Sequence, residues 1–171
     1  MNRATTLASR AFTDALLPRA AGDSPLGAAW EETRREATVA LERNALHEWL
    51  GALWGFVGAA NKFVDTEKPW ELAKAAKLGD AAAEEKLRGV LGDLLESCRL
   101  ISLYAAPAMP TIAAKIWTLL GRGWPYDANG HNGPSLDEIG AWGALGAGGP
   151  LGAPEPLFPR LEADALDAAA D

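Results

Sequence analysis

The residues from Ala45 to Lys74 constrain the fold of this chain more than any other stretch. Apolar side chains recur there at steps of three and four residues, the spacing of one face of an α-helix. They are Leu46, Trp49, Leu50, Leu53, Val57, Ala60 and Val64, with Trp54, Phe56 and Phe63 widening the stripe. A stripe this wide predicts a helix packed against several others and capped at its start by Asn44. After Asp65, Pro69 starts a second, short helix, because proline is tolerated in a first helical turn.

The other apolar patterns before residue 121 are also helical. We expect helices over Asn2 to Leu16, Leu26 to Arg43, Pro69 to about Lys77, Asp80 to about Tyr104 and Thr111 to Leu120. No segment alternates apolar and polar residues for long enough to predict a strand. The connections are short, which favours antiparallel neighbours. The predicted fold class is all-α, an antiparallel helical bundle.

From Gly121 onward, Gly and Pro replace the helical pattern. We therefore divide the chain into a bundle over 1–120, an irregular Gly/Pro-rich tail over 121–162 that packs back on the bundle, and a disordered end over 163–171. One helical turn is expected within the tail, because Ser135 and Glu138 have the spacing of a capping box. The apolar residues expected to anchor the tail are Trp124, Trp142, Leu157 and Phe158.

Composition excludes several classes of protein. The chain has 171 residues, one Cys and a net charge of −7. A single Cys98 allows no disulfide framework and suggests a reducing compartment, so we expect a cytoplasmic protein. No apolar run is long enough to span a membrane, so no membrane partner is expected. The negative charge disfavours indiscriminate binding to nucleic acid, and we expect no DNA partner.

Catalytic and metal-binding patterns are missing from the sequence. His47 and His131 have no Cys or His partner at ligand spacing, and Cys98 falls on an apolar helix face, which predicts a core residue. No nucleophile elbow, phosphate loop or dinucleotide fingerprint is present. We expect no metal, no cofactor and no catalysis by this chain alone.

Trp70 is the strongest candidate for a binding residue. A lone Trp at a helix start is most simply a core anchor. Here, however, Pro69 restricts the direction of the ring, and Asn61, Lys62 and Lys68 supply polar and charged groups around it. An aromatic plane flanked by hydrogen-bond donors suits an unstacked RNA base, which is recognised by stacking and by contacts to its edge.

This corner resembles the anticodon-binding domain of methionyl-tRNA synthetases. The matching residues are Ala60-Asn61-Lys62-Phe63-Val64-Asp65 and Lys68-Pro69-Trp70-Glu71-Leu72-Ala73-Lys74, then Pro107-Ala108-Met109-Pro110 and Pro156-Leu157-Phe158-Pro159-Arg160. Near the start, Asn2-Arg3 followed by Phe12 resembles the first helix of that domain. The resemblance covers nearly the whole chain, from Met1 to about Glu162.

The resemblance implies roles for individual residues. Trp70 is expected to stack on an anticodon base and Arg3 to contact a base edge or a phosphate. Asn61, Lys62 and Pro69 complete the expected anticodon-binding set, in which Lys62, together with Lys68, is a weaker electrostatic contact. The family pairs the first-helix Arg with an Asn four residues earlier, a position that would precede Met1.

The family also has an adenylate-forming domain, which binds ATP and methionine and has no counterpart in these residues. The expected function is therefore the anticodon-binding part of a methionine–tRNA ligase. Its expected partners are the anticodon loop of tRNA(Met) and the catalytic domain of the parent, on which the 121–162 tail could also pack. Two alternatives stay open: a subunit of a split synthetase, and a stand-alone tRNA-binding adaptor or helical scaffold.

Overall fold

The computed structural model describes residues 2–14, 16–127, 132–144, 146–153 and 157. Within these ranges the chain is helical and contains no strand, which confirms the predicted all-α class. The helices are α1 (Asn2–Ala11), α2 (Pro25–Glu42), α3 (Leu46–Glu67), α4 (Pro69–Lys77), α5 (Ala81–Ala105), α6 (Pro110–Leu119) and α7 (Leu136–Ile139), with a short 3-10 turn, η1 (Ala21–Asp23), before α2.

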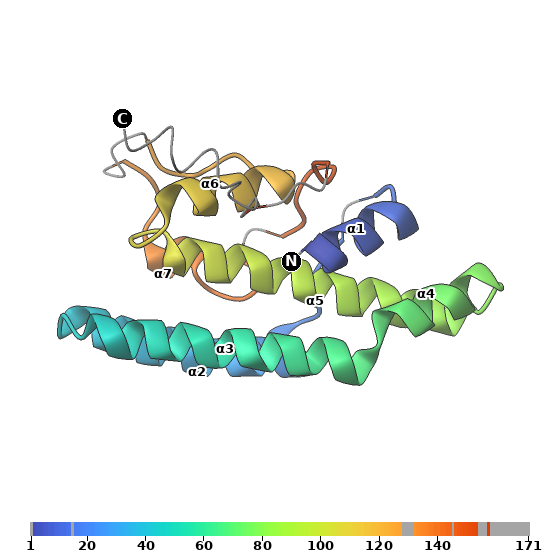
Figure 1. Cartoon of the computed structure of the whole chain (residues 1–171), viewed down its shortest axis with the longest axis horizontal. Helices are drawn as coiled ribbons and strands as arrows, with labels where there is room; N and C mark the ends of the chain where they lie inside the picture. The colour runs from blue at the N-terminus through green and yellow to red at the C-terminus, as the bar shows by residue number, and fades with distance from the viewer. Residues whose placement is uncertain (1, 15, 128–131, 145, 154–156, 158–171) are drawn as a thin grey trace, which may run out of the picture.

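Helix α5 is the centre of the bundle, and α1, α2, α3, α4 and α6 all contact it. In Figure 1, α2 and α3 form an antiparallel hairpin along one side of α5, and α1 and α6 lie along the other side. Helix α4 folds back beside the first half of α5. The short connections thus give antiparallel neighbours, as the sequence predicts.

Aromatic side chains pack against one another where α2, α3 and α5 meet. Trp30 of α2 is fully buried, and its ring meets Phe56 of α3 and Tyr104 of α5 edge-on. The ring centroids are 5.0 Å apart in both pairs, the range in which edge-to-face aromatic pairs are favourable. Val90 and Leu91, nearer the start of α5, are also fully buried. These contacts hold the α2–α3 hairpin on α5.

Two buried acids on α5 attach irregular segments to the bundle. Asp93 accepts hydrogen bonds from the backbone N–H of Arg19 at 2.8 Å and from its Nη2 at 2.6 Å. Glu96 pairs with Arg99 at 2.5 Å and accepts the backbone N–H of Gly143 at 2.7 Å. Because a buried charge needs such partners, these bonds fix the segment before α2 and the segment after α7 on α5.

The tail packs on the bundle between residues 139 and 143. Trp30 Nε1 donates to the Gly140 carbonyl oxygen at 2.7 Å, and Trp142 Nε1 donates to the Arg19 carbonyl oxygen at 2.8 Å. Trp142 is 9% exposed, so it anchors the tail as expected. Phe158 and residues 163–171 lie outside the described residues, and the domain bounds at 120 and 162 stay a prediction.

Two helix ends follow from local sequence, and one differs from expectation. The capping box at Ser135 and Glu138 is confirmed and starts α7. Helix α1, however, ends at Ala11 rather than at Leu16. The chain leaves the helix and passes so close to α5 that a Cβ on Gly92 would lie 2.0 Å from the Leu17 carbonyl oxygen. Only glycine permits this approach, and packing against α5 overrides the helical pattern.

The prediction that Asn44 caps α3 is wrong. The N-cap position is Ala45, and no side chain bonds to the free N–H groups there. Asn44 instead has φ of +56° and donates its N–H to the Leu41 carbonyl oxygen at 2.9 Å, which closes the turn after α2. Asn is one of the few residues besides Gly that adopts this left-handed conformation readily.

The predicted buried face of α3 is partly wrong. Trp49, Leu53, Phe56 and Phe63 are buried, but Trp54 is 66% exposed. Leu46 and Leu50 are exposed too, at 58% and 39%. Helix α3 packs chiefly on α2 and to a smaller extent on α5, so only part of its apolar surface is covered.

None of the helices in the described ranges combines the length and the apolar character that a bilayer-spanning segment requires.

Candidate nucleic-acid interface

The corner between α3 and α4 has a defined geometry. Lys68 lies between the two helices in the left-handed conformation, with φ of +45°. Its N–H donates to the Val64 carbonyl oxygen at 3.0 Å, which ends α3, and its own carbonyl oxygen accepts the Glu71 N–H at 2.8 Å, which starts α4. Pro69 occupies the first helical position, where its lack of an N–H loses no helical hydrogen bond. Trp70 is thereby held in the first turn of α4.

Trp70 lines a large groove formed by five helices. The groove has a volume of about 1150 Å³ and contains side chains of α1, α3, α4, α5 and α6. Its lining residues are Ala4, Thr6, Leu7, Arg10, Val57, Ala60, Asn61, Val64, Asp65, Pro69, Trp70, Leu94, Ser97, Cys98, Ile101, Ile116 and Leu157. The groove therefore brings together the first helix and the α3–α4 corner, which are distant in sequence.

The exposure of Trp70 decides between the two interpretations of this residue. Its relative exposure is 49%, whereas Trp49 of α3 is 3% exposed. Trp70 is thus not a core anchor, and part of its surface is available to a ligand in the groove. Pro69 beside it is buried, which fixes the backbone that carries the ring.

Some of the other predicted site residues line the groove and others lie outside its lining. Asn61 lines the groove, about two helical turns before the end of α3. Lys62 is exposed but is not a lining residue, because the next position on a helix points about 100° away. Lys68 is also outside the lining, and its Nζ lies 3.2 Å from a Glu71 carboxylate oxygen. Arg3 belongs to α1, and its side chain lies outside the described part of the structure.

Sequence reasoning missed two charged residues in the groove. Arg10 in the last turn of α1 is an exposed cation, and Asp65 of α3 is an exposed carboxylate. Their spacing from predicted site residues on the same helix could have indicated both. Arg10 follows Arg3 by seven residues, or about two turns, and Asp65 follows Asn61 by four residues, or about one turn.

The groove has an apolar floor and a polar rim. Leu94, Cys98 and Ile101 of α5 contribute to the floor, while Arg10 and Asn61 supply polar groups. Burial raises the pKa of the Cys98 thiol, so the thiol is protonated and uncharged near neutral pH. An apolar surface with a few hydrogen-bonding groups suits a flat ligand with polar edges.

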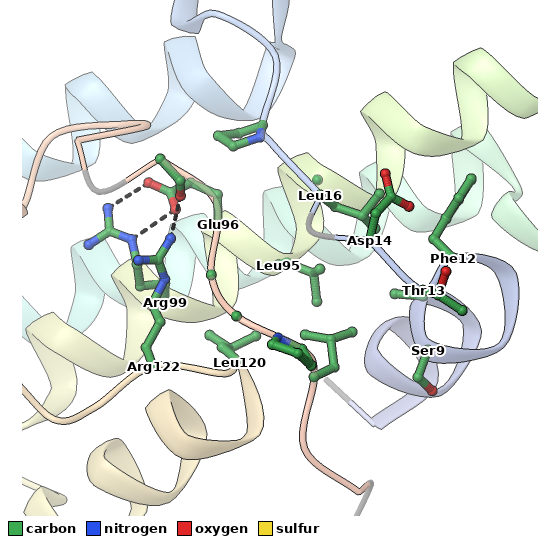
Figure 2. A pocket seen from close by; sticks show the side chains of 18 residues that line it. Ser9, Phe12, Thr13, Asp14, Leu16, Leu95, Glu96, Arg99, Leu120 and Arg122 are labelled. Atoms are coloured by element: carbon green, nitrogen blue, oxygen red, sulfur yellow. Dashed lines mark hydrogen bonds and ion pairs between the residues drawn. The ribbon is translucent and has the colours of Figure 1, made fainter.

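A second, smaller cavity lies between the segment after α1, α5 and the tail. Its volume is about 240 Å³, and Figure 2 shows Glu96, Arg99 and Arg122 at one end of it. The guanidinium of Arg99 bonds both carboxylate oxygens of Glu96 and donates to the carbonyl oxygens of Ile139 and Ala141. This pair attaches the tail to α5, and we interpret the cavity as structural.

Within the described ranges, no cluster of three or more His, Cys, Asp or Glu side chains could hold a metal ion. The groove is the candidate site, and its polar chemistry is that of indole, amide, guanidinium and carboxylate groups.

Comparison with known proteins identifies relatives of the chain. No protein-family model matches it. The methionine–tRNA ligase of Synechocystis sp. is 31% identical over 145 residues, or 83% of this chain. Those of Thermosynechococcus vestitus and Bacillus subtilis are each 32% identical, over 94% and 83% of this chain. The chain is homologous to part of the methionyl-tRNA synthetases. It spans 26%, 30% and 20% of the lengths of these three relatives.

Solved structures agree with this assignment. The apo form of Mycobacterium tuberculosis methionyl-tRNA synthetase matches with a TM-score of 0.75 and 27% sequence identity, over 94% of this chain and 30% of that one. The same synthetase in complex with methionyl-adenylate matches with a TM-score of 0.74 over 93% of this chain. The resemblance to methionyl-tRNA synthetases is confirmed, and the bundle is that of a segment of these enzymes.

Proposed function

We propose that this chain is the anticodon-binding part of a methionine–tRNA ligase and that the groove binds the anticodon loop of tRNA(Met). The observation that carries the proposal is the half-exposed Trp70, which lines the same groove as Asn61 of α3 and Arg10 of α1. The names of the relatives support tRNA as the ligand.

Trp70, Asn61 and Arg10 of the groove each have a role in this proposal. The indole of Trp70 stacks on one anticodon base, a contact that contributes about 1–3 kcal/mol in other single-strand binders. The amide of Asn61 both donates and accepts hydrogen bonds, so it can bind a base edge. Arg10, and Arg3 near the start of α1, supply cations for phosphates or base edges.

The size of the groove fits more than one nucleotide. Its volume of about 1150 Å³ exceeds the ~300–1,000 Å³ typical of a small-molecule site. Several unstacked bases of one loop are therefore accommodated together. Lys62 and Lys68 lie outside the lining and act only as long-range electrostatic contacts.

Aminoacylation requires ATP and methionine, and in this proposal both bind to the catalytic domain of the parent ligase rather than to this chain. That domain is the proposed protein partner, and the cytoplasm is the proposed location. The chain itself carries out recognition, without a cofactor or a metal.

The proposal is tested by fluorescence anisotropy with a labelled stem-loop that carries the methionine anticodon. A second stem-loop with an altered anticodon serves as the RNA control. We expect tighter binding to the methionine stem-loop, and we expect Trp70→Ala to remove that preference and to weaken binding about five-fold or more. Leu78→Ala is the matched protein control, because Leu78 is 82% exposed just after α4 and does not line the groove.

Salt dependence separates recognition from electrostatic attraction. A preference that persists as salt rises supports base recognition in the groove. Equal binding to both stem-loops that fades with salt would mean that only phosphate contacts operate, and it would contradict the proposal.

A further inference from the structure

Trp54 is an exposed tryptophan that neither the core nor the groove accounts for. It is 66% exposed, more than any other large apolar side chain of α3. Indole is mostly apolar, so leaving it in water forgoes the stabilisation that its burial would give. Trp49, five residues earlier, is buried and fills the core at this level of the bundle.

The position of Trp54 connects it to the groove. It precedes Val57 by three residues and Asn61 by seven, and both of those residues line the groove. Residues at these spacings share one helix face, so Trp54 continues the face of α3 that forms the groove wall. Seven residues of helix correspond to about 10 Å, which places Trp54 beyond the groove in the direction of the α3 N-terminus.

The surroundings of Trp54 are compatible with an RNA strand. From Trp49 to Val64 the sequence contains no Asp or Glu, although the whole chain has a net charge of −7, and Lys62 is its one charged residue. Carboxylates would repel phosphates, and the nearest ones along α3 are Glu48 and Asp65, six and eleven residues from Trp54. A protein partner would also accept an apolar face, but the continuity of this face with the proposed RNA groove favours RNA.

We propose that Trp54 is a second stacking platform, which binds a loop nucleotide outside the anticodon triplet. This inference rests on the proposed function, because both tryptophans then contact one RNA strand. Trp70 and the groove hold the triplet, and Trp54 holds a neighbouring unpaired base about 10 Å from Asn61, toward the N-terminus of α3. Every base has a π-face, so this contact adds affinity without reading sequence.

The test uses the full chain and the methionine stem-loop, with binding measured by anisotropy. Trp54→Leu keeps an apolar side chain but removes the aromatic face, whereas Trp54→Phe keeps a smaller aromatic face. We expect Trp54→Leu to weaken binding about five-fold or more and Trp54→Phe to retain most of the affinity. Leu46→Ala is the control, because Leu46 is 58% exposed on the same helix, eight residues from Trp54.

Abasic nucleotides identify the contacted base. Each loop position outside the triplet is replaced in turn, and binding to the wild type is compared with binding to Trp54→Leu. One position should weaken wild-type binding but leave Trp54→Leu unaffected, since the same contact is already lost. The altered-anticodon stem-loop should lose affinity in Trp54→Leu by the same factor as the methionine stem-loop.

The outcomes distinguish this inference from the proposed function. If Trp54→Leu binds within about two-fold of the wild type while Trp70→Ala is impaired, the inference is wrong and the anticodon proposal stands. Equal losses in Trp54→Leu and Trp54→Phe would also overturn it, because stacking would not be the cause. If the wild type shows no anticodon preference and Trp70→Ala changes nothing, both proposals fail.

Discussion

Asp93 is a carboxylate with no exposed surface, and it holds the segment between α1 and α2 on the central helix. It accepts hydrogen bonds from the backbone and guanidinium of Arg19 and from the Ser24 hydroxyl at 2.6 Å. Removing Asp93 is costly because the Arg19 backbone N–H and the Ser24 hydroxyl lose their acceptor, although the Arg19 side chain is 32% exposed and can still reach water.

We expect Asp93→Ala to lower the free energy of unfolding by about 1–3 kcal/mol. Urea denaturation monitored by circular dichroism measures this change. Asp14→Ala is the control, because Asp14 pairs with Arg88 at 2.7 Å with its side chain 62% exposed, and such surface pairs contribute little to stability. Equal effects of the two substitutions would contradict the structural role of Asp93.

Cys98 lines the groove, yet its thiol is a weak nucleophile. Burial raises its pKa, so a smaller fraction is thiolate at any given pH than for a free cysteine. We expect iodoacetamide to alkylate Cys98 more slowly than free cysteine at neutral pH. The rate should continue to rise at pH values where the rate for free cysteine has levelled off. Mass spectrometry of timed samples measures this, and a rate equal to that of free cysteine would show that the thiol is not desolvated.

Helix α3 shows what apolar periodicity can and cannot predict. The spacing of Trp49, Leu53, Phe56 and Phe63 correctly predicts a helix and part of its buried face. The same spacing makes Trp54 equally suited to burial, but no neighbouring helix covers that side. Which apolar residues a neighbour covers depends on the packing of the other helices, and one helix's sequence does not contain that information.

At the α3–α4 junction, the backbone conformation should make a glycine variant more stable than an alanine variant, which is the reverse of their usual order inside a helix. Lys68 has φ of +45°, which costs about 1–2 kcal/mol for residues with a Cβ and little for glycine. Lys68→Gly and Lys68→Ala both remove the charge and the contact with Glu71. We expect the glycine variant to be more stable than the alanine variant by about 1 kcal/mol in urea denaturation. Greater stability of the alanine variant would mean that the junction is not left-handed.

At the scale of the whole molecule, the sequence predicts the bundle but not the path of the tail. Helical periods and short connections give α2 to α6 with small errors at their ends. The contact between Trp30 and Gly140 joins residues 110 positions apart through an irregular segment, and no periodic signal predicts it. The groove likewise depends on contacts between segments that are distant in sequence. The corner motif indicates Trp70 and Asn61, whereas Arg10 enters the site only through the packing of α1.

The seven tryptophans are built-in reporters of where RNA binds. In a ¹H–¹⁵N NMR titration with the methionine stem-loop, the half-exposed Trp70 indole should shift or broaden as RNA is added. The indoles of Trp30 and Trp142 donate hydrogen bonds inside the bundle, so their resonances should stay in place. This pattern would locate the RNA in the groove. An unchanged Trp70 resonance under conditions where anisotropy shows saturated binding would contradict the account.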